Sequence, residues 1–184
     1  AIDFADAPDL AKKADKAVQA FSADNPAMWK LLRSQGVFVG RGPAPKVAFL
    51  FTGQGSQYVN MLAGLRDHEP IVRAVYDEAD RIMTPLLGKP LSDFVFGDSA
   101  DPEAVSRLEA QLMQTEITQP AVLTTDTALT HLMAAYGITP DLVMGHSLGE
   151  YGALVASGAL SFDAALEAVS ARGREMTHVS TDDN

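Results

Sequence analysis

Residues 141–150 read Asp-Leu-Val-Met-Gly-His-Ser-Leu-Gly-Glu, a short run that combines apolar residues with a G-x-S-x-G motif. The segment 141–145 predicts a short strand, the G-x-S-x-G motif at 145–149 predicts a turn, and a helix is predicted to follow. In this setting the motif indicates a nucleophile elbow, a tight turn that exposes a serine hydroxyl. Glycines are needed on both sides of the serine because a side chain there would collide with a neighbouring element. We therefore predict that Ser147 is a nucleophile; the alternative is a serine that caps a helix between two glycines required for packing.

A second apolar run, Val47–Phe51, predicts another strand of the same sheet. Like 141–145, it has the continuous apolar character that is typical of strands buried on both faces of a parallel sheet. Strands that alternate with helices indicate an α/β fold with a mostly parallel sheet. The helices predicted from the spacing of apolar residues span 69–83, 120–136, 150–159 and 162–176, with one more that begins at Pro102.

The first 45 residues differ in character from the rest of the chain. Five of the six lysines lie at or before Lys46, and helices are predicted over 8–21 and 26–32. Asn25-Pro26 has the pattern of an N-cap followed by proline at the first helical position. The run Gly-Arg-Gly-Pro-Ala-Pro at 40–45 then ends the region. We interpret residues 1–45 as a linker or adaptor and residues 46–184 as the part that carries the chemistry.

The composition of the chain excludes several classes of partner and of chemistry. The 184 residues carry a net charge of −10, which argues against nucleic acids and anionic membranes as partners. The absence of cysteine excludes disulfides, thiolate metal sites and a cysteine nucleophile. The acidic and histidine side chains show no metal-ligand spacing, so no metal site is predicted. The first residues have neither the basic nor the apolar segment of a signal peptide, and we expect a cytoplasmic protein.

Three further groups could serve a serine nucleophile. The backbone N–H of Leu148 begins the helix after the elbow, where free N–H groups can stabilise an oxyanion. Gly53-Gln54-Gly55 follows the first strand and could add a second amide donor, although a solvated turn has the same sequence character. Arg172 could hold an anionic group of the substrate, or lie exposed near a helix C-terminus. No histidine is well placed as a general base; His146 is expected to support the elbow, because adjacent side chains at a strand end point in opposite directions.

Four motifs occur together in one order: Phe51-Thr-Gly-Gln-Gly-Ser-Gln57, Thr118-Gln-Pro-Ala121, Gly145-His-Ser-Leu-Gly-Glu-Tyr151 and Arg172-Gly173. This combination resembles malonyl-CoA:acyl carrier protein transacylases, the acyltransferase domains of fatty acid and polyketide synthases. The resemblance covers roughly Lys46 to the end of the chain. It implies a parallel-sheet core like that of the α/β-hydrolases. The segment before it resembles the connection between a ketosynthase and an acyltransferase domain, as in polyunsaturated fatty acid or enediyne synthases.

The resemblance also implies a reaction and a set of site residues. Ser147 would take a malonyl group from malonyl-CoA and pass it to the phosphopantetheine thiol of an acyl carrier protein, with no covalently bound cofactor. The backbone N–H groups of Leu148 and Gln54 would form the oxyanion hole, and Arg172 would bind the malonyl carboxylate. His146 and Gln119 would lie in the substrate site. The implied partners are malonyl-CoA, the carrier protein and a neighbouring ketosynthase domain.

In the family that this chain resembles, the catalytic histidine and a small ferredoxin-like subdomain lie downstream of the arginine. We therefore expect that residues 46–184 are the N-terminal portion of the catalytic domain, interrupted near Asn184, and that a C-terminal half is a further partner. The ferredoxin-like subdomain is expected to be absent from this chain. Two alternatives stay open at this point: a serine hydrolase or thioesterase of the α/β-hydrolase type, and a non-catalytic docking fragment.

Overall fold

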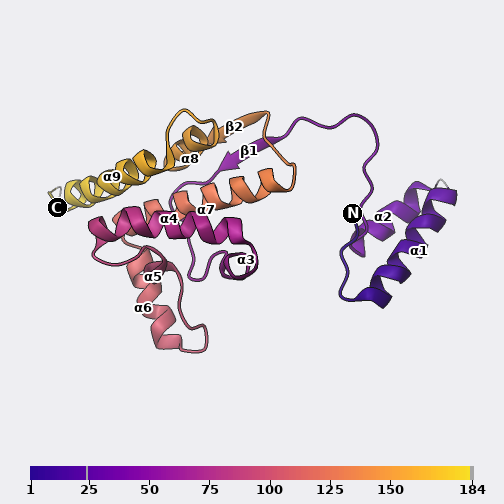
Figure 1. The fold of residues 1–184 in the computed structure, drawn as a ribbon, viewed down its shortest axis with the longest axis horizontal. Coiled ribbons are helices and arrows are strands. Elements are labelled where there is room, and N and C mark those ends of the chain that lie inside the picture. Colours follow the sequence, from indigo (N-terminus) through magenta and orange to yellow (C-terminus); the bar gives the residue numbers. More distant parts are fainter. Residues whose placement is uncertain (24, 183–184) are drawn as a thin grey trace. The chain divides into compact units, whose positions relative to one another are not determined.

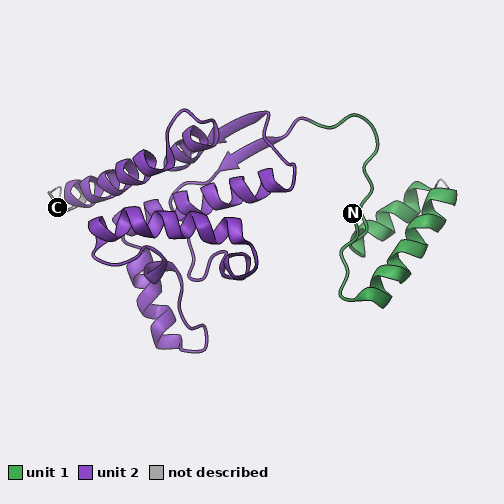
Figure 2. Ribbon diagram, in the orientation of Figure 1, with its two compact units in different colours: residues 1–45 green, residues 46–184 purple. Residues whose placement is uncertain are grey.

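The chain forms two units, Ala1–Pro45 and Lys46–Asn184, which Figure 2 shows in green and purple. The computed structural model describes residues 1–23 and 25–182. The predicted interruption near Asn184 therefore lies outside the described residues. The division between the units falls at the glycine- and proline-rich segment 40–45.

The first unit is a pair of helices, α1 (Ala7–Ala23) and α2 (Pro26–Ser34). The side chain of Asn25 accepts a hydrogen bond from the backbone N–H of Ala27 at 2.9 Å, so the predicted N-cap is present. The two predicted helices of this region are thus confirmed. Their small core consists of Ala20, Leu32 and Val37, with the partly buried residues Ile2, Ala17, Met28 and Trp29 packed around it.

The second unit contains a two-stranded parallel sheet and seven helices in its described part (Figure 1). Strand β1 (Ala48–Phe51) pairs with β2 (Leu142–Gly145) in a register that aligns Phe51 with Gly145. This pairing confirms the predicted α/β fold with a parallel sheet. The helices are α3 (Ala63–His68), α4 (Pro70–Leu87), α5 (Ser92–Val95), α6 (Pro102–Leu112), α7 (Thr115–Ala135), α8 (Gly149–Ala156) and α9 (Phe162–Asp182).

The sheet is covered on one face only, so the prediction of strands buried on both faces is wrong in this structure. Phe51 is buried and its ring packs beside Gly152 of α8. The opposite face presents Leu50, Leu142 and Met144, which are 72%, 56% and 56% exposed. Helices α7 and α8 supply packing partners for the covered face, and the described residues supply none for the other.

Helix α7 lies at the centre of the second unit and carries much of its core. Its consecutive residues Ile117–Thr124 are all buried, and Figure 1 shows it beside α4 and α9. The sequence places the start of this helix at Pro120, but the helix begins at Thr115 and Pro120 lies inside it. A proline near the first turns removes only one backbone hydrogen bond, and burial of the surrounding residues offsets that loss.

Several hydroxyl groups are satisfied within the helix. Thr124, Thr125 and Thr127 each donate a hydrogen bond to the carbonyl oxygen four residues earlier. Their polar groups can therefore lie in the apolar interior without the cost of an unpaired donor. The described helices include none that combines the length and the apolar character of a membrane span.

Candidate active site

The turn between β2 and α8 holds Ser147 in an unusual backbone conformation, with φ at +53°. Only a few residues other than glycine adopt this left-handed region, because the Cβ atom approaches the backbone, and such strain gathers at functional sites. The two flanking glycines explain how the turn is so tight. A Cβ atom on Gly145 would overlap the carbonyl group of Gly149, and one on Gly149 would overlap the carbonyl group of Phe51. The serine is exposed at the corner of this turn.

The loop 52–57 leaves the sheet beside this turn. It follows Phe51, the strand residue paired with Gly145, so both loops emerge at the carboxyl ends of adjacent parallel strands. The side chain of His146 lies against Gly53, where an added Cβ would come within 3.2 Å of His146 Nδ1. The loop is braced internally by a hydrogen bond between Thr52 Oγ1 and Ser56 Oγ at 2.9 Å. Glycine at position 53 thus allows the loop and the elbow to approach closely.

Two backbone N–H groups at these loops are candidates for binding an oxyanion. In the part of the chain that the structure describes, neither the N–H of Leu148 nor that of Gln54 donates a hydrogen bond. Leu148 stands at the start of α8, where the helix dipole adds partial positive charge, and its side chain is buried and fixed. The Gln54 side chain contacts Thr115 Oγ1 at 3.5 Å, which links the loop to the start of α7.

Arg172 of α9 reaches the serine across the fold. Its Nη2 donates to Ser147 Oγ at 3.2 Å, and its Nη1 donates to Gln119 Oε1 at 2.8 Å. Among the described residues, no carboxylate lies within 4.0 Å of this guanidinium group. The positive charge therefore stands next to the serine hydroxyl without an internal counter-ion.

Close packing between α9 and the start of α7 makes this contact possible. A Cβ atom on Gly173 would lie 2.6 Å from Glu116 Cα, so the two helices cross with backbone almost in contact. Because Gly173 directly follows Arg172, the crossing point places the arginine beside Gln119. The structure thus brings together three of the residues expected at the site, Ser147, Gln119 and Arg172.

Met176 is a site residue that the sequence reasoning missed. Its Sδ lies 3.4 Å from Gln119 Nε2, one helical turn beyond Arg172 on α9. The i, i+4 spacing from Arg172 is a signal that could have identified it. Arg174, by contrast, donates to Ser170 Oγ of its own helix at 3.1 Å and takes no part in these contacts.

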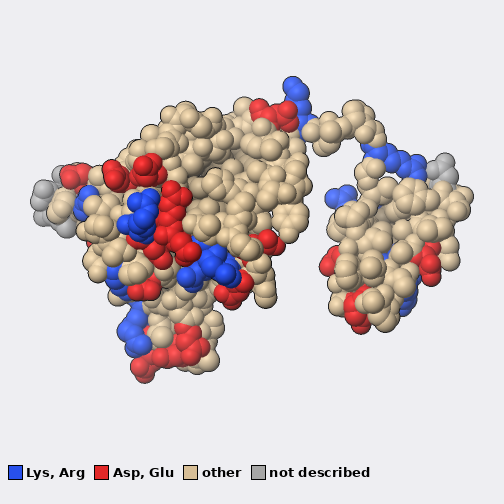
Figure 3. Space-filling view, in the orientation of Figure 1, with Lys and Arg blue, Asp and Glu red and all other residues tan. Residues whose placement is uncertain are grey.

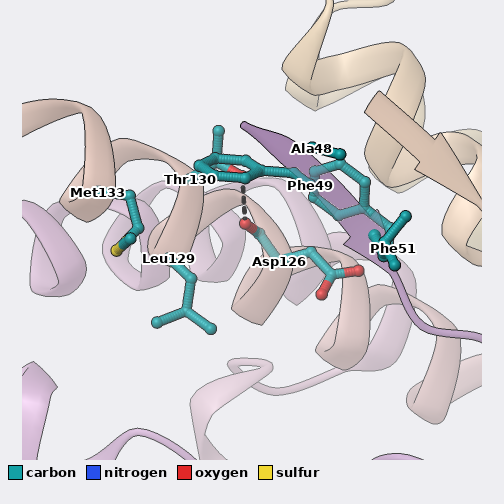
Figure 4. A pocket seen from close by; sticks show the side chains of 8 residues that line it. Ala48, Phe49, Phe51, Asp126, Leu129, Thr130 and Met133 are labelled. Carbon is teal, nitrogen blue, oxygen red and sulfur yellow. Dashed lines mark hydrogen bonds between the residues drawn. The ribbon is translucent and has the colours of Figure 1, made fainter. Parts of the chain in front are cut away.

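A cavity of about 280 Å³ lies between β1 and α7 (Figure 4). Its lining is mostly apolar and includes Phe49, Leu129 and Met133, but it also contains the carboxyl group of Asp126. Burial raises the pKa of Asp126 to about 7. Sequence reasoning missed this residue, although it is the one acidic side chain of α7 beyond the first turn of the helix. No cluster of three or more metal-ligating side chains occurs among the residues described.

On the face shown in Figure 3, most charged side chains of the second unit lie away from the sheet. In Figure 3 the Asp, Glu, Lys and Arg residues of the second unit concentrate over the helices at the left and bottom of the view. The region over β1, β2 and α8 is largely uncharged on this face.

Residues 48–184 match the model of the acyl transferase domain family. The malonyl CoA-acyl carrier protein transacylase of Bacillus subtilis (strain 168) is 44% identical over 131 residues, which are 71% of this chain and 37% of that protein. NorB, a protein of the spectinabilin polyketide synthase system of Streptomyces orinoci, is 36% identical over 159 residues, 86% of this chain and 7% of that protein.

A solved structure shows the same fold. A malonyl-transacylase in complex with its type II polyketide synthase acyl-carrier protein superposes with a TM-score of 0.62 and 36% identity. The match covers 73% of this chain and 40% of that one. The chain thus spans well under half the length of the proteins that it matches.

Proposed function

Because the chain belongs to the acyl transferase domain family, we propose that Ser147 carries a malonyl group from malonyl-CoA to the phosphopantetheine thiol of an acyl carrier protein. The observation that carries this proposal is the 3.2 Å contact between Arg172 Nη2 and Ser147 Oγ. It sets an uncompensated cation next to a nucleophile at a strained turn. Such a site suits an acyl group that bears its own carboxylate.

The first half-reaction forms an ester on the serine. Ser147 Oγ attacks the thioester carbonyl carbon, and the resulting oxyanion is stabilised by the N–H groups of Leu148 and Gln54. The carbon–sulfur bond then breaks and CoA leaves as the thiol, taking up the proton that the serine gave up. In the second half-reaction, the phosphopantetheine sulfur attacks the ester carbonyl carbon, the carbon–oxygen bond to the serine breaks, and the serine oxygen takes up the proton that the thiol gave up.

A general base must hold the serine proton during these steps. In the described structure the Ser147 hydroxyl is contacted by Arg172, a group that donates hydrogen bonds and does not accept them. We propose that the base is a histidine in the downstream segment of the family's catalytic domain. Residues 46–184 would then be the N-terminal portion of that domain, and the segment that carries the base would be its partner.

The first unit has a proposed role as an adaptor. The match to NorB extends over 159 residues, more than Lys46–Asn184 contains, and therefore reaches into Ala1–Pro45. This supports the proposal that residues 1–45 connect the acyltransferase domain to a neighbouring ketosynthase in a polyketide or fatty acid synthase. The acyl carrier protein is the proposed acceptor, as in the transacylase complex that this chain resembles.

The proposal is tested by incubating the chain with malonyl-CoA in the presence of the downstream segment of a family member, which supplies the base, and measuring the intact mass of the chain. We expect a malonyl adduct that maps to Ser147, is absent from Ser147→Ala and is transferred to a phosphopantetheinylated carrier protein. Release of free malonate without transfer to the carrier would instead indicate a serine hydrolase. Absence of any adduct in the presence of the downstream segment would favour the non-catalytic alternative.

Substitution of Arg172 tests the carboxylate role separately. We expect Arg172→Ala to weaken the binding of malonyl-CoA about 10- to 100-fold, since hydrogen bonds to charged groups contribute about 1.5–3 kcal/mol and 1.4 kcal/mol is a factor of ten. Binding of acetyl-CoA, which lacks the carboxylate, should change little. Isothermal titration of both ligands measures the effect, with Arg174→Ala as the matched control. Equal losses for the two ligands would contradict the role.

A further inference from the structure

Gln119 occupies a fully buried position inside α7, with both ends of its amide facing α9. Its Oε1 accepts from Arg172 Nη1 at 2.8 Å, and its Nε2 lies 3.4 Å from Met176 Sδ. Gln119 is therefore held by two residues one helical turn apart. It accepts a hydrogen bond from Nη1 of Arg172, whereas Nη2 of the same guanidinium group donates to Ser147 Oγ.

The orientation of this amide follows from the donor and acceptor character of its neighbours. A guanidinium group only donates, so the amide oxygen must face Arg172. The amide nitrogen is then directed at Met176, whose thioether sulfur is a weak acceptor. Reversal of the amide would set two donors against each other at Arg172. The surroundings thus select one arrangement of Gln119, in which it fixes one Nη group of the arginine.

The side chain of Gln119 is uncharged, and this determines how much of the positive charge of Arg172 stays available to a ligand. A carboxylate here would hold the guanidinium more strongly, because charge-assisted hydrogen bonds are roughly twice as strong as neutral ones. It would also cancel the positive charge, and an incoming carboxylate would have to compete with it. In the residues that the structure describes, no acid lies within 4.0 Å of Arg172. Gln119 therefore restrains the arginine and leaves its charge free for a ligand.

We propose that Gln119 is a positioning residue that sets the preference of the site for acyl groups bearing a free carboxylate, by orienting Arg172 toward Ser147. The inference rests on the proposed function for the identity of that ligand. The orientation of Arg172 itself does not depend on it. Gln119 thereby acts through the arginine, and the glutamine need not touch the substrate.

Two substitutions test separately whether Gln119 holds Arg172 in place and whether it leaves the positive charge of Arg172 uncompensated. Gln119→Leu removes the acceptor at similar volume, so we expect Arg172 to lose its fixed orientation. Gln119→Glu retains an acceptor and should keep the arginine in place while neutralising it. Both variants should lower the ratio of malonyl-CoA to acetyl-CoA affinity about tenfold or more, for these two different reasons.

The experiment combines titration calorimetry with NMR of the arginine side chains, on the full chain. In the wild type, slow rotation of the guanidinium group of Arg172 should give separate Nη resonances, assigned by their loss in Arg172→Lys. These resonances should merge in Gln119→Leu and stay separate in Gln119→Glu. Gln114→Leu is the matched control, since the exposed Gln114 side chain makes no hydrogen bond in the described structure. Gln119→Met replaces Gln119→Leu if the latter does not fold.

The outcomes distinguish this inference from the proposed function. An unchanged affinity ratio and unchanged Arg172 resonances in Gln119→Leu would overturn the positioning role. Loss of the Arg172 signature together with a lowered ratio would support it. A wild type that binds malonyl-CoA and acetyl-CoA equally would overturn the carboxylate preference and with it the proposed ligand. In that case the resonances still decide whether Gln119 orients the arginine.

Discussion

Gly145→Ala is expected to destabilise the second unit by at least about 3 kcal/mol, the upper part of the range for overpacking in a rigid interior. The added methyl group would overlap the carbonyl of Gly149 and the backbone nitrogen of Glu150. Both obstacles are backbone atoms at the start of α8, which cannot rotate aside as a side chain can. Relief would require α8 to move away from the sheet, and the oxyanion donor of Leu148 would move with it.

Chemical unfolding followed by far-UV circular dichroism measures this loss. The matched control is Gly64→Ala, the same substitution in α3, where an added Cβ meets nothing within 4 Å. We expect that control to be neutral or slightly stabilising, because alanine favours helix more than glycine does. If both variants unfolded at the same denaturant concentration, the close contact between the elbow and α8 would be refuted.

Asp126→Asn is expected to stabilise the chain at pH 8 by about 2 kcal/mol. Burial raises the pKa of Asp126 from 3.8 to about 7, so ionisation of this carboxyl opposes folding above that pH. Each pKa unit corresponds to about 1.4 kcal/mol, which sets a ceiling of about 4 kcal/mol. The side chain lies at a cavity and is only partly shielded, and solvent screening reduces the effect.

The pH dependence gives the sign of this effect. The folded state binds a proton at Asp126 that the unfolded state has released, so stability falls as the pH rises from about 4 to about 7. The advantage of Asp126→Asn should therefore grow over this interval and level off above it. Thermal melting across the pH range measures the difference. Asp77→Asn, at an exposed position of α4, is the control. A difference that is the same at pH 4 and pH 8 would argue against a buried carboxyl at position 126.

The sequence predicts the local features of this protein better than its long-range contacts. Residues 141–150 contain their own strand, glycine pair and helix start, so the elbow follows from neighbours in the chain. The start of α7 does not follow from neighbouring residues. Pro120 has the sequence pattern of a proline at the first helical position, but burial of Ile117 and Thr118 extends the helix back to Thr115. The short helices α3 and α5 carry too few apolar repeats to be recognised.

In the candidate site, too, the sequence predicts local features better than long-range contacts. The G-x-S-x-G motif predicts Ser147, and the family resemblance adds Gln119 and the role of Arg172. Spacing along the chain does not reveal that the guanidinium of Arg172 contacts the other two residues. That contact depends on how closely α9 crosses α7, which Gly173 permits. The exposed face of the sheet was also missed. An apolar strand sequence indicates that both faces of the strand can be buried. It does not indicate which segment, if any, packs on each face.

The pairing of β1 with β2 also has a consequence for synthesis of the protein. The backbone N–H of Val47 donates to Asp141 Oδ2, 94 residues away, so the two strands cannot meet until the intervening helices have been made. At about 5–20 residues per second, the nascent β1 segment waits roughly 5–20 s for its partner. During that interval Phe49, Leu50 and Phe51 have no strand beside them. Slow translation between residues 52 and 140 should therefore favour aggregation or chaperone capture on the ribosome.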